Sequence, residues 1–203
     1  MNILFLGGNS GTAGHRAGAL RRLGHAVHQI APDQMVPAGR LQSRLHWETG
    51  GLLSEKAVAA QVLAALGETK FDLTWVDNGR NVGPILVREL QRRYGPVVNY
   101  NVDDPYGRRD RFAWSLYKKA VPTYNLVIVV REENVAEAKA LRAKKVLRVY
   151  RSADEVAPQA FEPSFLDHVI GTDYRENVSH TREYKMDWSS QFELIRNLEF
   201  TKV

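Results

Sequence analysis

Short apolar runs alternate with longer segments of helical spacing along roughly the first 150 residues. The runs contain few polar positions, which is typical of strands that are buried on both faces of a sheet. Most of the segments between them repeat apolar residues every three or four positions and end at glycine or proline, as amphipathic helices do. The pattern predicts strands over 2–6, 25–30, 71–76, 97–100, 125–130 and 145–149, and helices over 13–23, 54–66, 82–94, 111–120 and 134–142.

The stretch 31–51 interrupts this alternation. It contains Pro32, Pro37, Gly39 and Gly50, and these residue types favour turns over regular structure. We therefore predict an irregular connection there. Ser54 follows it and has the position of a helix N-cap before an apolar stripe.

Strands that alternate with helices and short loops require parallel crossover connections. The sequence therefore predicts an α/β fold: a Rossmann-like, doubly wound parallel sheet of about six strands, in one domain over residues 1–158. The pattern is weaker beyond that point. We predict a short irregular or helical C-terminal extension over 159–203, with a strand opening at 168–170 and a helix over 189–198.

The composition is that of an ordinary globular protein, with 44% hydrophobic and 25% charged residues. The 203 residues include no cysteine, which excludes disulfides, thiolate zinc sites, iron–sulfur clusters and cysteine nucleophiles.

The apolar start is too short for a membrane span and lacks the basic front of a secretory signal, so we expect a soluble, cytoplasmic protein without a transmembrane segment. The formal net charge of +5 either favours anionic partners or only solvates the surface. Nothing resembles a nucleic-acid-binding motif, so we expect no nucleic acid partner.

Ligands of open parallel sheets bind beyond the carboxyl ends of the strands, and the first such loop is rich in glycine. Its glycines allow sharp turns, and the helix that follows presents N–H groups to a phosphate or a sugar hydroxyl. The dinucleotide fingerprint and the P-loop pattern are both absent. His15 is a candidate general base, or hydrogen-bonds a neighbouring loop, and Arg16 binds a phosphate or is solvated. The other candidate substrate-binding residues of this loop are Gly8, Asn9, Ser10, Gly11 and Thr12.

Three further loops follow predicted strands. Asn78 and Arg80 lie after the third strand, where they contact a hydroxylated or anionic ligand, or form an Asx turn and helix cap. Asp103 and Asp104 follow the fourth strand, and adjacent carboxylates can supply a general base. They lack the further ligands that a metal needs, so no metal site is predicted. Arg131, after the fifth strand, is a candidate anion contact.

Several ordered segments resemble the N-terminal half of the CgeB-like (spore maturation protein type) glycosyltransferases, over residues 1–158. They are ILFLGGNSGTAGHRAGALRRLGHAV, FDLTWVDNGRNVGPILVRELQRR, PVVNYNVDDPYGRRD and YNLVIVVREENVAEAKALRAKKVLRVYRSADEVAP. The resemblance implies the GT-B architecture, in which two Rossmann-like domains face a cleft. The N-terminal domain receives the acceptor, the C-terminal domain holds the nucleotide-sugar donor, and no metal is generally needed. His15 and either Asp103 or Asp104 then become candidate bases, and Arg80 and Arg131 become anion contacts.

The chain departs from this family near its end. Residues 169–172 resemble the strand that opens the donor domain, but only about thirty residues follow them. A single βαβ unit already needs about thirty residues, so we expect that they do not form a second Rossmann domain. We expect an acceptor-side domain for transfer from a nucleotide-sugar to an acceptor hydroxyl, with no other cofactor and with a second subunit or domain supplying the donor site. The alternative is a non-catalytic Rossmann module that binds a nucleotide or a sugar, or that docks a partner subunit. A nicotinamide-dependent oxidoreductase, with Asp33 on a ribose, is a third hypothesis that the missing glycine fingerprint disfavours.

Overall fold

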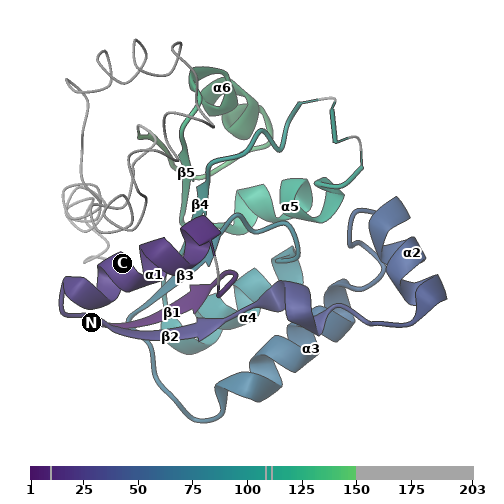
Figure 1. Ribbon diagram of the computed structural model, residues 1–203. Helices are drawn as coiled ribbons and strands as arrows, with labels where there is room; N and C mark the ends of the chain where they lie inside the picture. Colours follow the sequence, from purple (N-terminus) through teal and green to yellow (C-terminus); the bar gives the residue numbers. More distant parts are fainter. Residues whose placement is uncertain (10, 108, 111, 150–203) are drawn as a thin grey trace, which may run out of the picture.

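A computed structural model describes residues 1–149 except 10, 108 and 111. Strands and helices alternate along this part of the chain (Figure 1). The strands are β1 (Asn2–Leu6), β2 (Ala26–Ile30), β3 (Leu73–Asp77), β4 (Val97–Asn101), β5 (Leu126–Val129) and β6 (Val146–Arg148). The α-helices are α1 (Gly11–Arg22), α2 (Arg40–Glu48), α3 (Glu55–Leu66), α4 (Pro84–Tyr94), α5 (Ser115–Ala120) and α6 (Glu132–Ala140), and the 3-10 helices are η1 (Pro32–Met35) and η2 (Val121–Thr123).

The six strands form one sheet in the order β2-β1-β3-β4-β5-β6, and every neighbouring pair is parallel. This confirms the predicted α/β, Rossmann-like architecture. The chain passes from β1 outward to β2 and then returns to the other side of β1 to form β3. The winding therefore reverses between β1 and β3, and the loops that follow these two strands flank the position where such sheets bind ligands.

Two hydrophobic clusters cover the two faces of the sheet. Successive side chains of a strand point to opposite faces, so Leu4 and Leu6 pack in one cluster with residues of α3, α4 and α5. Ile3 and Phe5 pack in the other cluster, to which α1 contributes Ala17, Ala19 and Leu20. The same alternation continues at the ends of β3 and β4, and it decides which side of the sheet each polar group faces.

The prediction of an irregular connection over 31–51 is wrong. This stretch contains η1 and the nine-residue helix α2, which lies at the periphery of the molecule in Figure 1. No side chain of α2 is buried. The helix therefore lacks the apolar stripe toward the core that identifies a helix in a sequence, and its flanking Gly39 and Gly50 suggested turns instead.

Some predicted features lie outside the described residues. They are Ser10, Arg111 at the start of the helix predicted over 111–120, the last residues of the predicted domain, the strand at 168–170 and the helix over 189–198. The described part of the fifth predicted helix begins at Ser115. Among the described residues, no helix is both long and apolar enough to cross a membrane.

Candidate functional site

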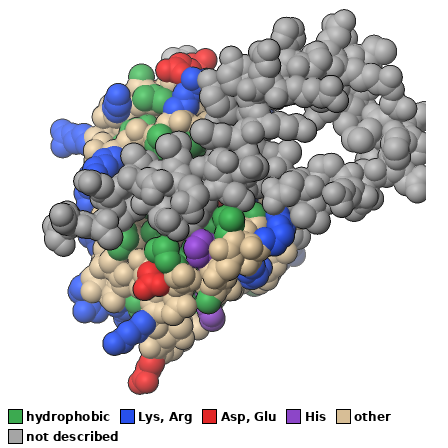
Figure 2. Space-filling model, turned by 90° about the vertical axis from the view of Figure 1, so that its left-hand side faces the viewer, with side chains coloured by type: hydrophobic (Ala, Val, Ile, Leu, Met, Phe, Trp, Pro, Cys, Tyr) green, Lys and Arg blue, Asp and Glu red, His purple; other side chains and the backbone are tan. Residues whose placement is uncertain are grey.

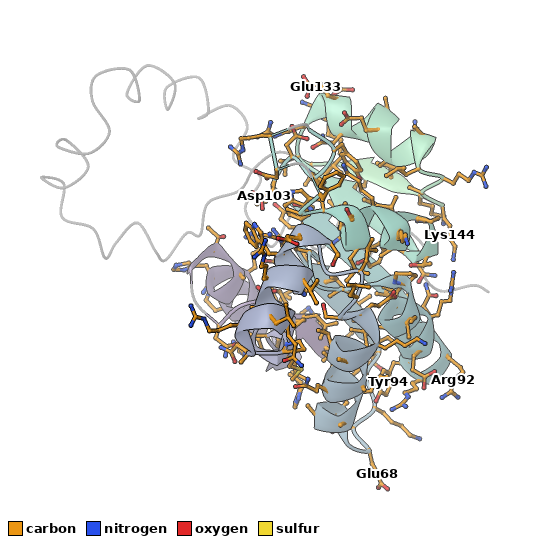
Figure 3. The ribbon with its side chains drawn as sticks, turned by 90° about the vertical axis from the view of Figure 1, so that its right-hand side faces the viewer. Glu68, Arg92, Tyr94, Asp103, Glu133 and Lys144 are labelled. Atoms are coloured by element: carbon orange, nitrogen blue, oxygen red, sulfur yellow. The ribbon has the colours of Figure 1, made fainter. Side chains whose placement is uncertain are left out.

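Polar side chains gather at the carboxyl ends of β3 and β4, next to the position where the winding reverses. Figure 3 shows Asp103, which follows β4, at the opposite end of the molecule from Tyr94 and Lys144, which precede strands. Three of the polar residues at this edge are asparagines, and we call Asn78, Asn99 and Asn101 the asparagine cluster. The cluster connects the two strand ends through hydrogen bonds.

Asn99 and Asn101 fix the loop that follows β3. Both side chains are almost completely buried, and both donate from Nδ2 to the carbonyl oxygen of Asn78, at 3.3 and 3.1 Å. Asn99 also accepts a hydrogen bond from the Tyr117 hydroxyl at 3.1 Å. Asn78 has a positive φ of 65°, and Gly79 has one of 85°. The loop thus turns in the left-handed region that asparagine and glycine tolerate best.

The asparagine cluster also orients Asp103. Asn78 Nδ2 donates to Asp103 Oδ2 at 2.7 Å, and the Asp103 amide donates to Asn101 Oδ1 at 2.9 Å. The side chain is half-buried, and its Oδ1 accepts no hydrogen bond from the described residues. Asp103 therefore presents one oriented carboxylate oxygen at the ligand-binding edge of the sheet.

Asp104 is directed to a different neighbourhood. Its Oδ1 accepts hydrogen bonds from the Gly107 amide at 3.0 Å and from Asn134 Nδ2 at 3.2 Å. Its Oδ2 lies 3.8 Å from Arg131 Nη1. The two adjacent carboxylates thus have separate partners, and Asp104 and Arg131 join the start of α6 to the loop after β4.

Arg16 and Asp77 form a buried ion pair on the α1 side of the sheet. Arg16 Nε lies 2.8 Å from Asp77 Oδ1, and the two side chains are 5% and 6% exposed. The guanidinium carbon of Arg16 lies 5.0 Å from the centroid of the Tyr100 ring. Burial raises the pKa of Asp77 to about 6, although the positive charge of Arg16 opposes the shift. Arg16 was expected to hold a phosphate or to be solvated, and it is instead buried against its own acidic partner.

Arg80 is oriented by an aromatic ring that the sequence did not associate with it. Its guanidinium carbon lies 4.4 Å from the centroid of the Trp47 ring, while its amide donates to Asn78 Oδ1 at 3.1 Å. The guanidinium makes no ion pair or hydrogen bond with the described residues. A stacked guanidinium with unused donors is suited to bidentate contact with a phosphate or a carboxylate.

A second polar group, which was not predicted, lies near Arg80. His46 Nδ1 is in hydrogen-bond contact with Ser54 Oγ, and Asn81 Nδ2 donates to Asp33 Oδ1 at 2.5 Å. Burial is the main cause that lowers the pKa of His46, and the charge of Arg80 lowers it further. Ser54 occupies the predicted N-cap position, but its hydroxyl donates to the Gly51 carbonyl at 3.1 Å instead of capping α3.

The glycine-rich loop after β1 is more open than the β3 and β4 loops. Asn9, Gly11 and Thr12 are exposed and Gly8 is half-buried, and the Gly8 carbonyl accepts a hydrogen bond from Gln29 at 2.6 Å. The start of α1 is therefore accessible to a ligand. His15 lies on this helix with an exposed side chain, and its role as a base stays a prediction.

The first turn of α4, by contrast, is already occupied by a carboxylate of the protein. Glu55 Oε1 accepts a hydrogen bond from the Ile85 amide at 2.8 Å, and a Cβ on Gly83 would lie 2.5 Å from the same oxygen. Since a helix N-terminus attracts negative charge, Glu55 excludes an anionic ligand from this position. Of the described groups at this edge, Arg80, the start of α1 and the exposed Arg131 remain for an anion.

Charged side chains of both signs are exposed in the described part of the chain. Figure 2 shows Lys and Arg side chains interspersed with apolar and acidic ones on the side that it presents. No group of three or more histidine, aspartate and glutamate residues in the described part of the chain could hold a metal ion. Comparison with models of known protein families gives no match, and comparison with curated proteins gives no significant match.

Proposed function

We propose that this chain is the acceptor-side domain of a sugar transferase, which moves a sugar from a nucleotide-sugar to an acceptor hydroxyl. The observation that carries the proposal is the orientation of Asp103 by Asn78, at 2.7 Å. The same Asn78 side chain accepts a hydrogen bond from the amide of Arg80, whose guanidinium forms no ion pair with the described residues. The resemblance of the sequence to CgeB-like glycosyltransferases implies the same class of reaction. Supporting it further, these groups lie at the edge where parallel sheets bind their ligands.

The proposed reaction assigns a different task to each group. The oxygen of the acceptor hydroxyl attacks the anomeric carbon, and Asp103 Oδ1 accepts the proton that this hydroxyl loses. The bond from the anomeric carbon to the diphosphate oxygen breaks, and the diphosphate leaves with the electron pair. Arg80 binds a negative group of the bound substrates by bidentate contact. A partner subunit or second domain supplies the remainder of the donor site.

Asp103 is favoured over Asp104 as the base because of its contacts. Asp104 already accepts two hydrogen bonds and lies near Arg131, so less of its basicity is available to a substrate. Asn78 anchors the loop that orients Asp103, and Arg16 supports the same strand ends from the α1 side through Asp77. Arg16 therefore has a structural role in the proposal rather than contact with a phosphate.

The test compares Asp103→Asn with Glu68→Gln in a transfer assay that includes the donor-binding subunit or domain, over a panel of nucleotide-sugars and hydroxyl acceptors. The asparagine retains the shape of Asp103 but cannot accept a proton, so transfer falls by about a hundredfold or more. Glu68 lies at the opposite end of the molecule (Figure 3), so its variant retains wild-type transfer. Unchanged transfer in Asp103→Asn would remove the proposed base.

A non-catalytic binding module is the second candidate function, because an oriented guanidinium can bind an anionic ligand without chemistry. Calorimetric titration with nucleotides, nucleotide-sugars and NADH distinguishes the candidates. Two results together would support the binding module. A nucleotide or nucleotide-sugar binds and Arg80→Met abolishes this binding, while neither transfer nor donor hydrolysis occurs even with a donor-binding partner present. Tight binding of NADH alone would instead support the oxidoreductase hypothesis.

A further inference from the structure

Large apolar side chains are exposed on segments that follow the carboxyl ends of β2, β3 and β4. Leu41, Leu53, Trp47 and Phe112 have exposed fractions of 70%, 68%, 64% and 64%. Leu45 and Ile85 are exposed to a smaller extent, at 38% and 39%. We call these six residues the apolar rim: Leu41, Leu45, Trp47, Leu53, Ile85 and Phe112.

Backbone contacts bring the contributing segments together. The Leu116 amide donates to the Gly50 carbonyl at 3.1 Å, which joins the start of α5 to the loop after α2. A Cβ on Gly50 would lie 1.8 Å from the Phe112 carbonyl oxygen, so the loop after α2 packs directly on the segment that carries Phe112. The Ile85 amide is bound by Glu55, just after Leu53 along the chain. Figure 3 views the molecule from the side on which α2 lies in Figure 1.

Helix α2 has an exposed face on which apolar and basic side chains alternate. Leu41 and Leu45 are four residues apart and form one stripe, and Arg40, Arg44 and Trp47 form the adjacent stripe. Because the helix buries no side chain, the core gives it little of the packing that normally stabilises a helix of nine residues. Contact with another surface would provide that packing.

Three exposed arginines, Arg40, Arg44 and Arg109, lie on the segments that carry the apolar rim, together with acidic side chains. Arg40 makes no ion pair with the described residues, whereas Arg44 lies 2.7 Å from Glu48 and Arg109 lies 3.2 Å from Asp110. The side chains of Arg44 and Arg109 are still 76% and 91% exposed, so both can reach a second partner. The whole chain also carries a formal net charge of +5.

We propose that the apolar rim binds the surface of a membrane that contains anionic lipids. Leucine, tryptophan and phenylalanine side chains enter the boundary between headgroups and acyl chains, while arginines contact lipid phosphates and bury their aliphatic stems. Apolar residues that are separated by arginines suit this layered environment better than a continuous apolar groove of a protein. The proposal does not depend on sugar transfer, since lipid binding requires neither a donor nor an acceptor.

The test is co-sedimentation of the full chain with vesicles of phosphatidylcholine, with and without about 30% phosphatidylglycerol. We expect binding to the anionic vesicles to be about tenfold stronger or more, and to weaken at high salt. The emission of Trp47 shifts to shorter wavelength on binding, and Trp47→Phe lacks this shift. Absence of binding to the anionic vesicles would overturn the proposal.

Two double variants separate the apolar and electrostatic contributions. Leu41→Ser with Leu53→Ser reduces binding about tenfold or more, since both apolar contacts are lost. Arg40→Glu with Arg44→Glu reduces binding by a similar factor. The matched control is the pair Lys70→Glu and Lys145→Glu, which changes the net charge equally on exposed residues that precede β3 and β6 and changes binding less than about twofold.

Circular dichroism verifies that the variants fold, and folding is expected because every substituted side chain is exposed. Equal loss of binding in the lysine control would show that only net charge matters and would overturn the role of the rim. Sedimentation velocity without vesicles provides a further check. A dimer that Leu41→Ser with Leu53→Ser dissociates would assign the rim to a second copy of the chain, also against the proposal.

Discussion

Two buried tyrosines near the asparagine cluster differ in the hydrogen bonding of their hydroxyl groups. Tyr117 donates to Asn99 Oδ1 at 3.1 Å and so completes the hydrogen bonds of a fully buried asparagine. The Tyr124 hydroxyl is also buried but has no hydrogen-bond partner in the described part of the chain. Burial raises the pKa of both side chains, so both hydroxyls stay protonated across the physiological range.

Replacement of each tyrosine by phenylalanine is expected to separate these two states. Tyr117→Phe leaves Asn99 Oδ1 without its donor and lowers the free energy of unfolding by about 1–3 kcal/mol. Tyr124→Phe removes a hydroxyl that has no hydrogen-bond partner among the described residues, and it changes the free energy of unfolding by about 0.5 kcal/mol or less. Urea unfolding of both variants measures the difference, and an equal loss in both would contradict the hydrogen-bond argument.

At the scale of elements, the loop between β3 and α4 positions most of the candidate site. Gly79 has a φ of +85° there, and a Cβ on it would lie 2.9 Å from Asn99 Nδ2. Gly24, between α1 and β2, has a similar φ of +83°, but a Cβ on it would meet no atom within 4 Å. Both glycines thus adopt the left-handed backbone conformation, and only Gly79 also lies so close to a neighbouring side chain, that of Asn99, that a Cβ would not fit.

Gly79→Ala and Gly24→Ala therefore form a matched pair. Both lose about 1 kcal/mol or more of unfolding free energy from the left-handed backbone, and Gly79→Ala loses more because its new methyl group displaces Asn99. Only Gly79→Ala is expected to change the NMR environment of Asp103, through Asn78. If the two variants have the same stability and the same Asp103 resonances, the close contact has no structural importance.

The sequence predicted elements well where their apolar residues face the core. The strands and the helices packed on them were recognised from their hydrophobic periodicity, whereas α2 was missed because its leucines and its tryptophan are exposed. The location of the site followed from a general property of parallel sheets. Its pairings could not be predicted, because Trp47 is distant from Arg80 in the sequence, and the partner of Arg16 depends on which face Asp77 takes.

At the scale of the whole molecule, the buried Arg16–Asp77 pair connects stability to pH. The pKa of Asp77 is raised from 3.8 to about 6, mainly by burial. Between these values the folded protein holds a proton on Asp77 that the unfolded chain has released. Folding therefore binds protons in this range, and the contribution of Asp77 to stability falls as the pH rises.

We expect Asp77→Asn to remove this contribution to the pH dependence. The stability of the wild type relative to the variant should decrease as the pH rises from about 4 to about 6 and should then level off. Urea unfolding at several pH values measures the difference, with Asp72→Asn, a change at an exposed carboxylate just before β3, as the control. A difference that stays constant with pH would contradict the raised pKa.

The ends of β3 and β4 present their polar groups to opposite faces of the sheet. Asp77 faces Arg16 of α1, whereas Asn99 faces Tyr117 of α5. Inserting or deleting one residue in either strand would shift its end by one position and turn Asp77 or Asn99 to the opposite face of the sheet, away from its partner. Natural variants of this protein should consequently differ in length within the loops around this edge, while these two strands retain a constant number of residues.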